Sequence, residues 1–405
     1  MNTISKTLSL AIIALTVACG SSNDGGDNPQ PPPEPTVTPE PTVTPEPTVT
    51  PEPTPAPSPE PTPSLTRTAA ILTTDFENGS LSTFPMDDFE DVSLDRVSLN
   101  SDAVGRAYEE IVYVINRFGA DNIQALDSTN DYETLWQCSV GNGANPHDFV
   151  KVSESRGYVS LYDKGTVAVV NLDPRPDCED FIEEEIDLAS LADADGVAEP
   201  DQMVVSGDTL YVSIQLLDRN DPFFTPTGPG MLALIDTLNN ELYGTITLSG
   251  ANPFSETKGL QLAPDRRKIA VAQVGLFGSF DGGIEWVDME EEAAEGYFIT
   301  EEDLGGDITD FVIVSDTRGY AIVADADFNN KVIRFDPSSG TAQSELLGGP
   351  AYLPDLEYDF RNEELLVASQ DFENPGVRIF AGDDSEITTE PINTGLPPFN
   401  ICLVD

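Results

Sequence analysis

Two stretches of sequence decide the fold: GYVSLYDKGTVAVVNLDP at residues 157–174 and GYAIVADADFNNKVIRFDPSSG at residues 319–340. Each holds a run of β-branched and aromatic residues, a polar turn and a second such run, which is the pattern of a β-hairpin. Six such pairs follow one another along the chain. Their first runs are IVYVIN (111–116), GYVSLY (157–162), LYVSIQ (210–215), KIAVAQ (268–273), GYAIVA (319–324) and LLVASQ (365–370).

The spacing of these runs predicts a β-propeller. Successive first runs lie 45, 53, 58, 51 and 46 residues apart, and repeats of this length with several short strands are typical of propeller blades. Residues 69–84 match both runs but lack an inner strand, whereas PPFNICLVD at 397–405 is an inner strand with nothing after it. Pairing the two ends closes the ring. We therefore predict an all-β, seven-bladed propeller over residues 68–405; a β-sandwich, the alternative, rarely shows so long a period.

The paired runs at 157–174 and 319–340 look like the YVTN-type repeat of seven-bladed, lactonase-like surface propellers. The resemblance covers about residues 68–405 and is specific for fold rather than for activity. That family includes surface-layer and lipoprotein binding modules as well as relatives that hydrolyse lactones. The resemblance therefore implies the fold and leaves several functions open.

The beginning of the chain predicts export and lipidation. Lys6 precedes an apolar run from Leu8 to Val17 that is too short to span a bilayer, and Ala18 and Cys19 follow. The segment resembles a bacterial lipoprotein signal, in which the chain is cut before the cysteine and the thiol is lipidated. We expect residues 1–18 to be the signal peptide and Cys19 to anchor the protein in the outer membrane, with an ordinary secretory signal as the alternative.

Residues 19–67 are expected to be a spacer. PEPTVT recurs there with a period of six from Pro33, Pro39 and Pro45. Proline fixes φ and removes a hydrogen-bond donor, so an extended polyproline II linker is expected and a packed domain is not. About 35 such residues reach on the order of 100 Å. Recognition of the prolines by a partner is the alternative interpretation.

Charge and composition exclude several functions. The chain carries 72 acidic and 19 basic residues, a formal charge of −53. Nucleic acid would be repelled, and an anionic membrane surface too, so we expect no nucleic-acid partner and membrane contact only through the lipid. His147 is the single histidine, which excludes multi-histidine metal motifs.

One ring of positions is the main candidate site. Ten or eleven residues before each first run lies the expected start of an inner strand, where equivalent side chains would encircle one mouth of the channel. These ligand-binding candidates are Asp102, Asp148, Asp201, Lys258, Asp310, Asp355 and Asn400. A cation or cationic ligand would neutralise the aspartates; alternatively they only cap turns in a hydrated funnel. His147 adjoins this mouth, as a base or ligand or as a surface residue.

The loops between the paired runs are expected to open on the same face. Asp325, Asp327, Asn329 and Asp336 have the spacing of a calcium loop, but without the usual glycine and glutamate, and calcium is the one cofactor candidate. Two loops are longer than the repeat needs. They carry Phe223 and Phe224 within 216–230 and Phe277 and Phe280 within 275–283, which either contact a partner or fold back on the blades.

The cysteines predict one disulfide. Of the three cysteines after Cys19, Cys138 and Cys178 are the preferred disulfide pair and Cys402 is expected to be buried.

We favour a lipid-anchored binding or scaffolding propeller with a protein or small-molecule partner. The alternatives are a lactonase-like or other metal-dependent hydrolase using His147 and Asp148, with aspartates of the ring as metal ligands, and a structural surface-layer component.

Overall fold

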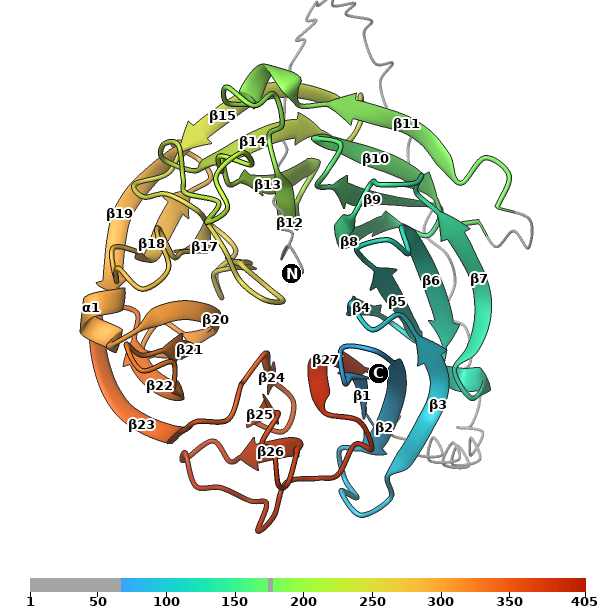
Figure 1. Cartoon of the computed structure of the whole chain (residues 1–405), viewed down its shortest axis with the longest axis vertical. Helices are drawn as coiled ribbons and strands as arrows, with labels where there is room; N and C mark the ends of the chain where they lie inside the picture. Colours follow the sequence, from blue (N-terminus) through green and yellow to red (C-terminus); the bar gives the residue numbers. More distant parts are fainter. Residues whose placement is uncertain (1–66, 174–177) are drawn as a thin grey trace, which may run out of the picture. The chain divides into compact units, whose positions relative to one another are not determined.

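The computed structural model describes residues 67–173 and 178–405, which form seven antiparallel sheets around a central axis (Figure 1). The predicted seven-bladed propeller is therefore confirmed. The expected signal peptide, Cys19 and nearly all of the linker lie outside the described residues. In the described part, no helix has the length and apolar character needed to cross a membrane.

Each blade is named by its strands from the centre outward. Blade 1 holds β27 (Pro398–Val404), β1 (Thr68–Thr74), β2 (Gly79–Pro85) and β3 (Ser93–Leu99). Blade 2 holds β4 (Ala103–Tyr108), β5 (Ile111–Asn116), β6 (Asn122–Asp127) and β7 (Glu133–Ser139). Blade 3 holds β8 (Pro146–Ser153), β9 (Arg156–Leu161), β10 (Thr166–Asn171) and β11 (Ile182–Asp187).

The other four blades follow the same order. Blade 4 holds β12 (Pro200–Ser206), β13 (Thr209–Ile214), β14 (Met231–Asp236) and β15 (Glu241–Thr247). Blade 5 holds β16 (Leu260–Leu262), β17 (Lys268–Gln273), β18 (Gly283–Asp288) and β19 (Ala293–Thr300), and the short helix α1 (Glu301–Leu304) follows it. Blade 6 holds β20 (Asp307–Ser315), β21 (Arg318–Ala324), β22 (Asn330–Asp336) and β23 (Thr341–Gly349), and blade 7 holds β24 (Leu356–Asp359), β25 (Glu364–Ser369) and β26 (Gly376–Phe380).

The ring closes through its two ends, as predicted. The last strand, β27, pairs antiparallel with β1, and Ala70 lies opposite Cys402 in the register. This pairing covers the inner edge of β1, which would otherwise expose unpaired backbone groups. Cys402 is 3% exposed and has a free thiol, in agreement with its expected burial.

The second and third strands of each blade carry most of the core. In β13 and β14, Leu210, Val212, Leu232, Leu234 and Ile235 are all fully buried. Both faces of these strands pack against neighbouring blades, so they read as continuous apolar runs instead of alternating ones. Each such side chain contributes about 1.5–3 kcal/mol of burial free energy. The recurring runs in the sequence are therefore the contact layers between blades.

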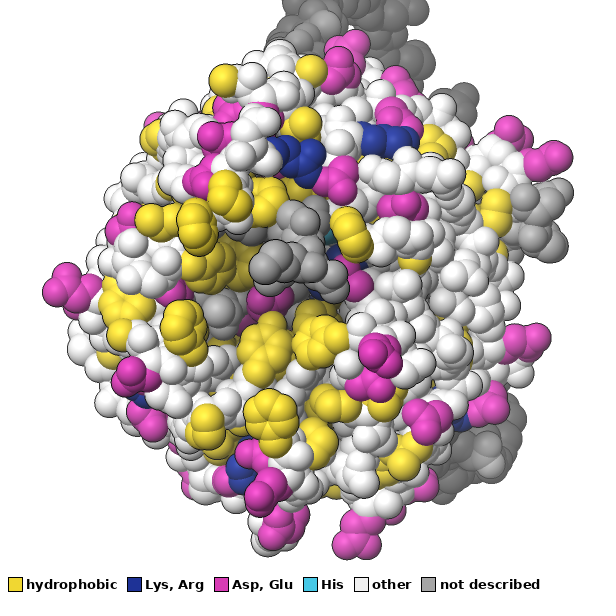
Figure 2. All heavy atoms as spheres, in the orientation of Figure 1, with side chains coloured by type: hydrophobic (Ala, Val, Ile, Leu, Met, Phe, Trp, Pro, Cys, Tyr) yellow, Lys and Arg dark blue, Asp and Glu magenta, His cyan; other side chains and the backbone are white. Residues whose placement is uncertain are grey.

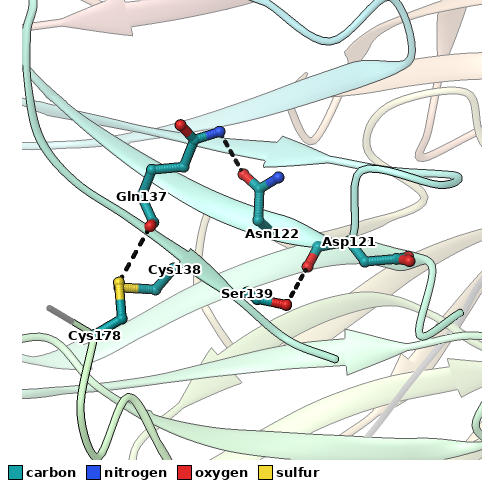
Figure 3. The surroundings of a disulfide bond; sticks show 6 residues. All are labelled: Asp121, Asn122, Gln137, Cys138, Ser139 and Cys178. Carbon is teal, nitrogen blue, oxygen red and sulfur yellow. Dashed lines mark hydrogen bonds between the residues drawn. A yellow bond between two sulfur atoms is a disulfide. The ribbon is translucent and has the colours of Figure 1, made fainter. Parts of the chain in front are cut away.

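A disulfide joins blades 2 and 3 (Figure 3). Cys138 lies on the outer strand β7, and Cys178 lies in the connection between β10 and β11. This is the pair that the sequence favoured. The bond links two outer elements of neighbouring blades.

Candidate functional site

The candidate site lies on the end of the propeller at which the inner strands begin, which we call the mouth face. Because the strands of a blade are antiparallel, the loops between the second and third strands lie on the same face. These loops are 75–78, 117–121, 162–165, 215–230, 274–282, 325–329 and 370–375. The sequence prediction that loops and ring share one face is thus met by the topology.

Equivalent residues near the start of the inner strands form a ring of hydrogen bonds between blades. At five junctions a side-chain oxygen accepts from a backbone N–H of the next blade. The pairs are Asp148–Met203 (2.6 Å), Gln202–Gly259 (3.1 Å), Asp310–Leu356 (3.0 Å), Asp355–Ile401 (2.5 Å) and Asn400–Gly105 (2.7 Å). All five acceptor residues are buried. The ring holds the blades together and does not present free carboxylates to a ligand.

Two members of the expected ring are corrected by these contacts. The equivalent positions in blades 2 and 4 are Val104 and Gln202, not Asp102 and Asp201, as the pairing registers show. The inner strands of blades 3 and 6 each contain a β-bulge just before the turn into the second strand, and this bulge adds a residue. The inner strands of blades 2 and 4 have no bulge at that turn. A count of ten or eleven residues back from the first run therefore ends before the ring position in blades 2 and 4.

The buried carboxylates of Asp310 and Asp355 lie on either side of the Thr257 hydroxyl. Thr257 Oγ1 lies 3.3 Å from one and 2.7 Å from the other. Burial, and then the charge of Asp355, raise the pKa of Asp310 well above its usual value. Lys258, expected to neutralise the ring, instead forms an ion pair with Glu357.

Arg106 contacts three other blades at the level of the ring, and sequence reasoning did not identify it. Its guanidinium lies 2.8 Å from Asp148, 3.1 Å from the side-chain oxygen of Gln202 and 2.7 Å from the Thr257 carbonyl. It thus connects blade 2 to blades 3, 4 and 5. Burial raises the pKa of Asp148, and the Arg106 charge opposes that shift.

His147 is buried, which corrects the expectation of a surface histidine. It is 4% exposed, stacks on Tyr162 with ring centroids 5.0 Å apart, and places Nδ1 3.4 Å from Asp201. Burial and the charges of Arg117 and Arg219 lower its pKa well below the usual value. His147 is therefore a neutral imidazole at physiological pH.

Arg117, which acts on His147, connects it to further charged groups. Arg117 Nη2 lies 2.5 Å from Asp102. Burial opposes the charge of Arg117, but the carboxylates of Asp102, Glu256 and Asp201 outweigh it and raise its pKa. Burial and neighbouring Glu256 likewise raise the pKa of Tyr352. We call the residues Asp102, Arg117, His147, Asp201, Glu256 and Tyr352 the mouth cluster. Asp102 and Asp201 thus belong to this cluster and not to the ring.

Glu199, next to the mouth cluster, gives a pH-dependent prediction. One carboxylate oxygen accepts from Leu217 N at 3.0 Å, and burial raises its pKa to about 8. The folded state holds this proton up to about pH 8, whereas the unfolded chain releases it near pH 4.5, so its contribution to stability falls as pH rises through that window. We expect Glu199→Gln to gain at least about 1 kcal/mol over the wild type between pH 5 and 8.5 in urea unfolding. Parallel profiles would contradict this, and Glu291→Gln, on an exposed turn, is the control.

The proposed calcium loop is also corrected. Asp325 accepts backbone hydrogen bonds from Asp327 and Asn329, both at 3.0 Å, and forms an ion pair with Lys331 at 2.9 Å. Asp336 lies at the other end of β22 and so cannot join them. Hydrogen bonding to Lys331 lowers the pKa of Asp325 to about 2. Across residues 67–173 and 178–405, no three His, Cys, Asp or Glu side chains are placed to hold a metal ion.

Exposed phenylalanines recur on the mouth face. Six of its seven hairpin loops each carry one, and we call this set the mouth-face phenylalanines. They are Phe76 (64% exposed), Phe118 (56%), Phe223 (80%), Phe277 (44%), Phe328 (81%) and Phe372 (100%). Of the four predicted loop phenylalanines, Phe223 and Phe277 belong to this set, whereas Phe224 and Phe280 are half-buried. Aligning the seven loops would have revealed the other four members.

The surface around the axis combines apolar and acidic groups. Figure 2 shows hydrophobic side chains gathered around a hollow at the centre, with acidic side chains among and outside them. The bases in the mouth-face loops are already paired: Arg117 with Asp102, Lys164 with Glu185 and Arg219 with Asp163. An incoming partner therefore meets phenylalanine rings and carboxylates.

Comparison with known proteins supports the fold. No protein-family model matches the chain, and no curated protein matches it. Among solved structures, proteins of Bacteroides uniformis and Bacteroides fragilis, both provisionally named 6-phosphogluconolactonases, share 15% and 14% identity, with TM-scores of 0.59 and 0.57. The alignments cover 84% and 85% of this chain and 99% and 100% of those chains. A streptogramin B lyase matches with 11% identity and a TM-score of 0.53 over 75% of this chain and 87% of its own. The chain is a seven-bladed β-propeller with lactonase-like structural neighbours.

Proposed function

We propose that the protein is a lipid-anchored binding propeller that presents its mouth face to a partner at the cell envelope. The observation that carries the proposal is the presence of six exposed phenylalanines on one face, one in each of six blades. Large apolar side chains that repeat in this way on a single face mark an interaction surface, whereas isolated ones need no explanation. A lipid on Cys19 and the proline-rich linker would tether the propeller to the outer membrane.

The interior of the channel supports binding over metal-dependent chemistry. The ring aspartates are bound to neighbouring backbone groups, and Asp148 is additionally paired with Arg106. Asp148 thereby joins blades 2, 3 and 4. Recognition would therefore take place at the loops and the mouth cluster and not deeper in the channel.

The test compares the mouth face with the opposite face. In the full-length protein, Phe118, Phe223 and Phe277 are replaced together by Ser, and in a control Leu238 and Phe360 are replaced by Ser. These control residues are 69% and 58% exposed, in turns at the other end of the blades. Crosslinking to the envelope fraction of the source cells should give a partner with the wild type and the control but not with the triple variant. Unchanged crosslinking in the triple variant would contradict the proposal.

A second candidate function is lactone hydrolysis, and His147 is the observation that favours it. A neutral imidazole 3.4 Å from a carboxylate, with Arg117 nearby, offers a general base and a cation for a developing oxyanion. The structural neighbours provisionally named lactonases share only the fold. Assays with γ- and δ-lactones should show turnover that His147→Asn removes; equal rates for both proteins would exclude this activity.

A further inference from the structure

A cleft between blades 6 and 7 combines acidic and apolar groups. It has a volume of about 280 Å³. Asn330 and Leu347 of blade 6 form part of its wall, and Asp371, Glu373 and Glu390 of blade 7 contribute carboxylates. The cleft adjoins the mouth-face loops 325–329 and 370–375, so it opens on the surface that the proposed function uses.

The charge of the cleft selects a cation. Its one basic lining residue, Arg378, is already paired with Glu386, at 2.9 Å. Backbone hydrogen bonds from Glu373 and Asn374 lower the pKa of Asp371, so this carboxylate is ionised at neutral pH. Three acidic residues therefore line a cavity whose one arginine is paired with Glu386, and one of the three, Glu390, accepts a hydrogen bond from Asn374 Nδ2 at 3.0 Å.

The apolar parts of the cleft fit the stem of a long cationic side chain. Leu347, Leu353 and Pro391 line it. Lysine and arginine bury their methylene stems against such surfaces and leave the charged group to polar partners. The cavity volume is ample for one side chain of this size.

Two of the mouth-face phenylalanines are close in sequence to residues that line the cleft. Phe372 stands between the lining residues Asp371 and Glu373 and is 100% exposed; Phe328 precedes the lining residue Asn330 by two positions and is 81% exposed. An aromatic face next to carboxylates attracts a cation through its quadrupole as well as through charge. The same arrangement, phenylalanine beside ionised aspartate, recurs in the adjoining blade at Asp75 and Phe76.

We propose that this face binds a basic polypeptide, with a lysine or arginine side chain of the partner inserted between blades 6 and 7. The inference deepens the proposed function and rests on it. The formal charge of −53 gives long-range attraction for such a partner and repels acidic ones. The cleft and the two phenylalanines then give the attraction a defined place.

The experiment measures binding of three synthetic peptides to the full-length protein by fluorescence anisotropy. One peptide alternates lysine with alanine, one alternates glutamate with alanine, and one alternates serine with alanine. Only the lysine peptide should bind. Glu373→Gln with Glu390→Gln should weaken it by about tenfold, and Phe328→Ser with Phe372→Ser by a similar factor.

A charge-matched control separates the cleft from the general acidity of the protein. Glu183→Gln with Glu291→Gln removes two exposed carboxylates elsewhere and should weaken binding by less than about twofold. Equal losses in the two glutamine variants, or undiminished binding after replacement of Phe328 and Phe372, would overturn the cleft as the site. The test of the proposed function uses phenylalanines of blades 2, 4 and 5, so either result can fail without the other.

Discussion

Removal of Pro398–Asp405 is expected to leave the protein without a cooperative unfolding transition. This segment is the inner strand of blade 1, and Phe399, Ile401 and Val404 are each at most 6% exposed. Losing their burial alone costs about 5–9 kcal/mol, which is comparable with the whole stability of a typical domain. The deletion also exposes the inner edge of β1 and leaves Asp355 without the Ile401 N–H.

The measurement is thermal and urea unfolding followed by circular dichroism, with limited proteolysis as a second readout. Removal of Asp405 alone is the control, because it deletes only exposed ion pairs with Arg67 and Arg361 and should cost less than about 1 kcal/mol. A peptide of residues 398–405 added in excess should restore a transition to the truncated chain. A truncated protein that melts cooperatively close to the wild type would show that ring closure is dispensable.

The fold could be predicted from the sequence because each blade contains the same pattern of apolar runs within its own stretch of the chain. The contact layers between blades require apolar strands on both faces, so runs such as GYVSLY (157–162) and GYAIVA (319–324) stand out without an alignment. The closing strand was identified for the same reason: 397–405 has an inner-strand pattern and no partner within its own end of the chain. Local pattern and global topology agree at these positions.

The candidate ring could be predicted only in part, since β-bulges do not show in the sequence. Asp148, Asp310, Asp355 and Asn400 lie at equivalent positions of the ring, but a count that includes a bulge near the turn into the second strand fails at Gln202 and Val104, because β12 and β4 have no bulge at that turn. The role of the ring aspartates could not be predicted from the sequence either. A buried aspartate that accepts backbone N–H groups and an aspartate that awaits a cation look the same in a sequence.

Burial of polar side chains was the second property beyond reach of the sequence. His147 follows a proline in a glycine-rich stretch, which is typical of an exposed loop, yet Tyr162 from the loop 162–165 and Asp201 from β12 pack against it. Arg106 could not be predicted as a site residue from the sequence, because its partners lie in three other blades. Contacts across the axis depend on the closed ring and have no local signature.

Replacement of Arg106 by Met is expected to destabilise the protein by about 3–5 kcal/mol, because it leaves the buried carboxylate of Asp148 without a counter-charge. Methionine keeps much of the volume, so the loss reports on charge and hydrogen bonding more than on a cavity. The double variant Arg106→Met with Asp148→Asn should be more stable than the single one. Its asparagine no longer carries the stranded charge and can still accept from Met203 N.

The pH dependence of this loss gives a sharper test of its cause. Without Arg106, burial holds the pKa of Asp148 further above its value in the unfolded chain, so stability falls as pH rises through that interval. The cost of Arg106→Met in urea unfolding should therefore be smaller at pH 5 than at pH 8. Arg96→Met is the control, because its partner Asp131 is exposed and the expected cost is below about 1 kcal/mol. Equal costs at Arg106 and Arg96 would mean that the arginine across the channel does not hold blades 2 to 5 together.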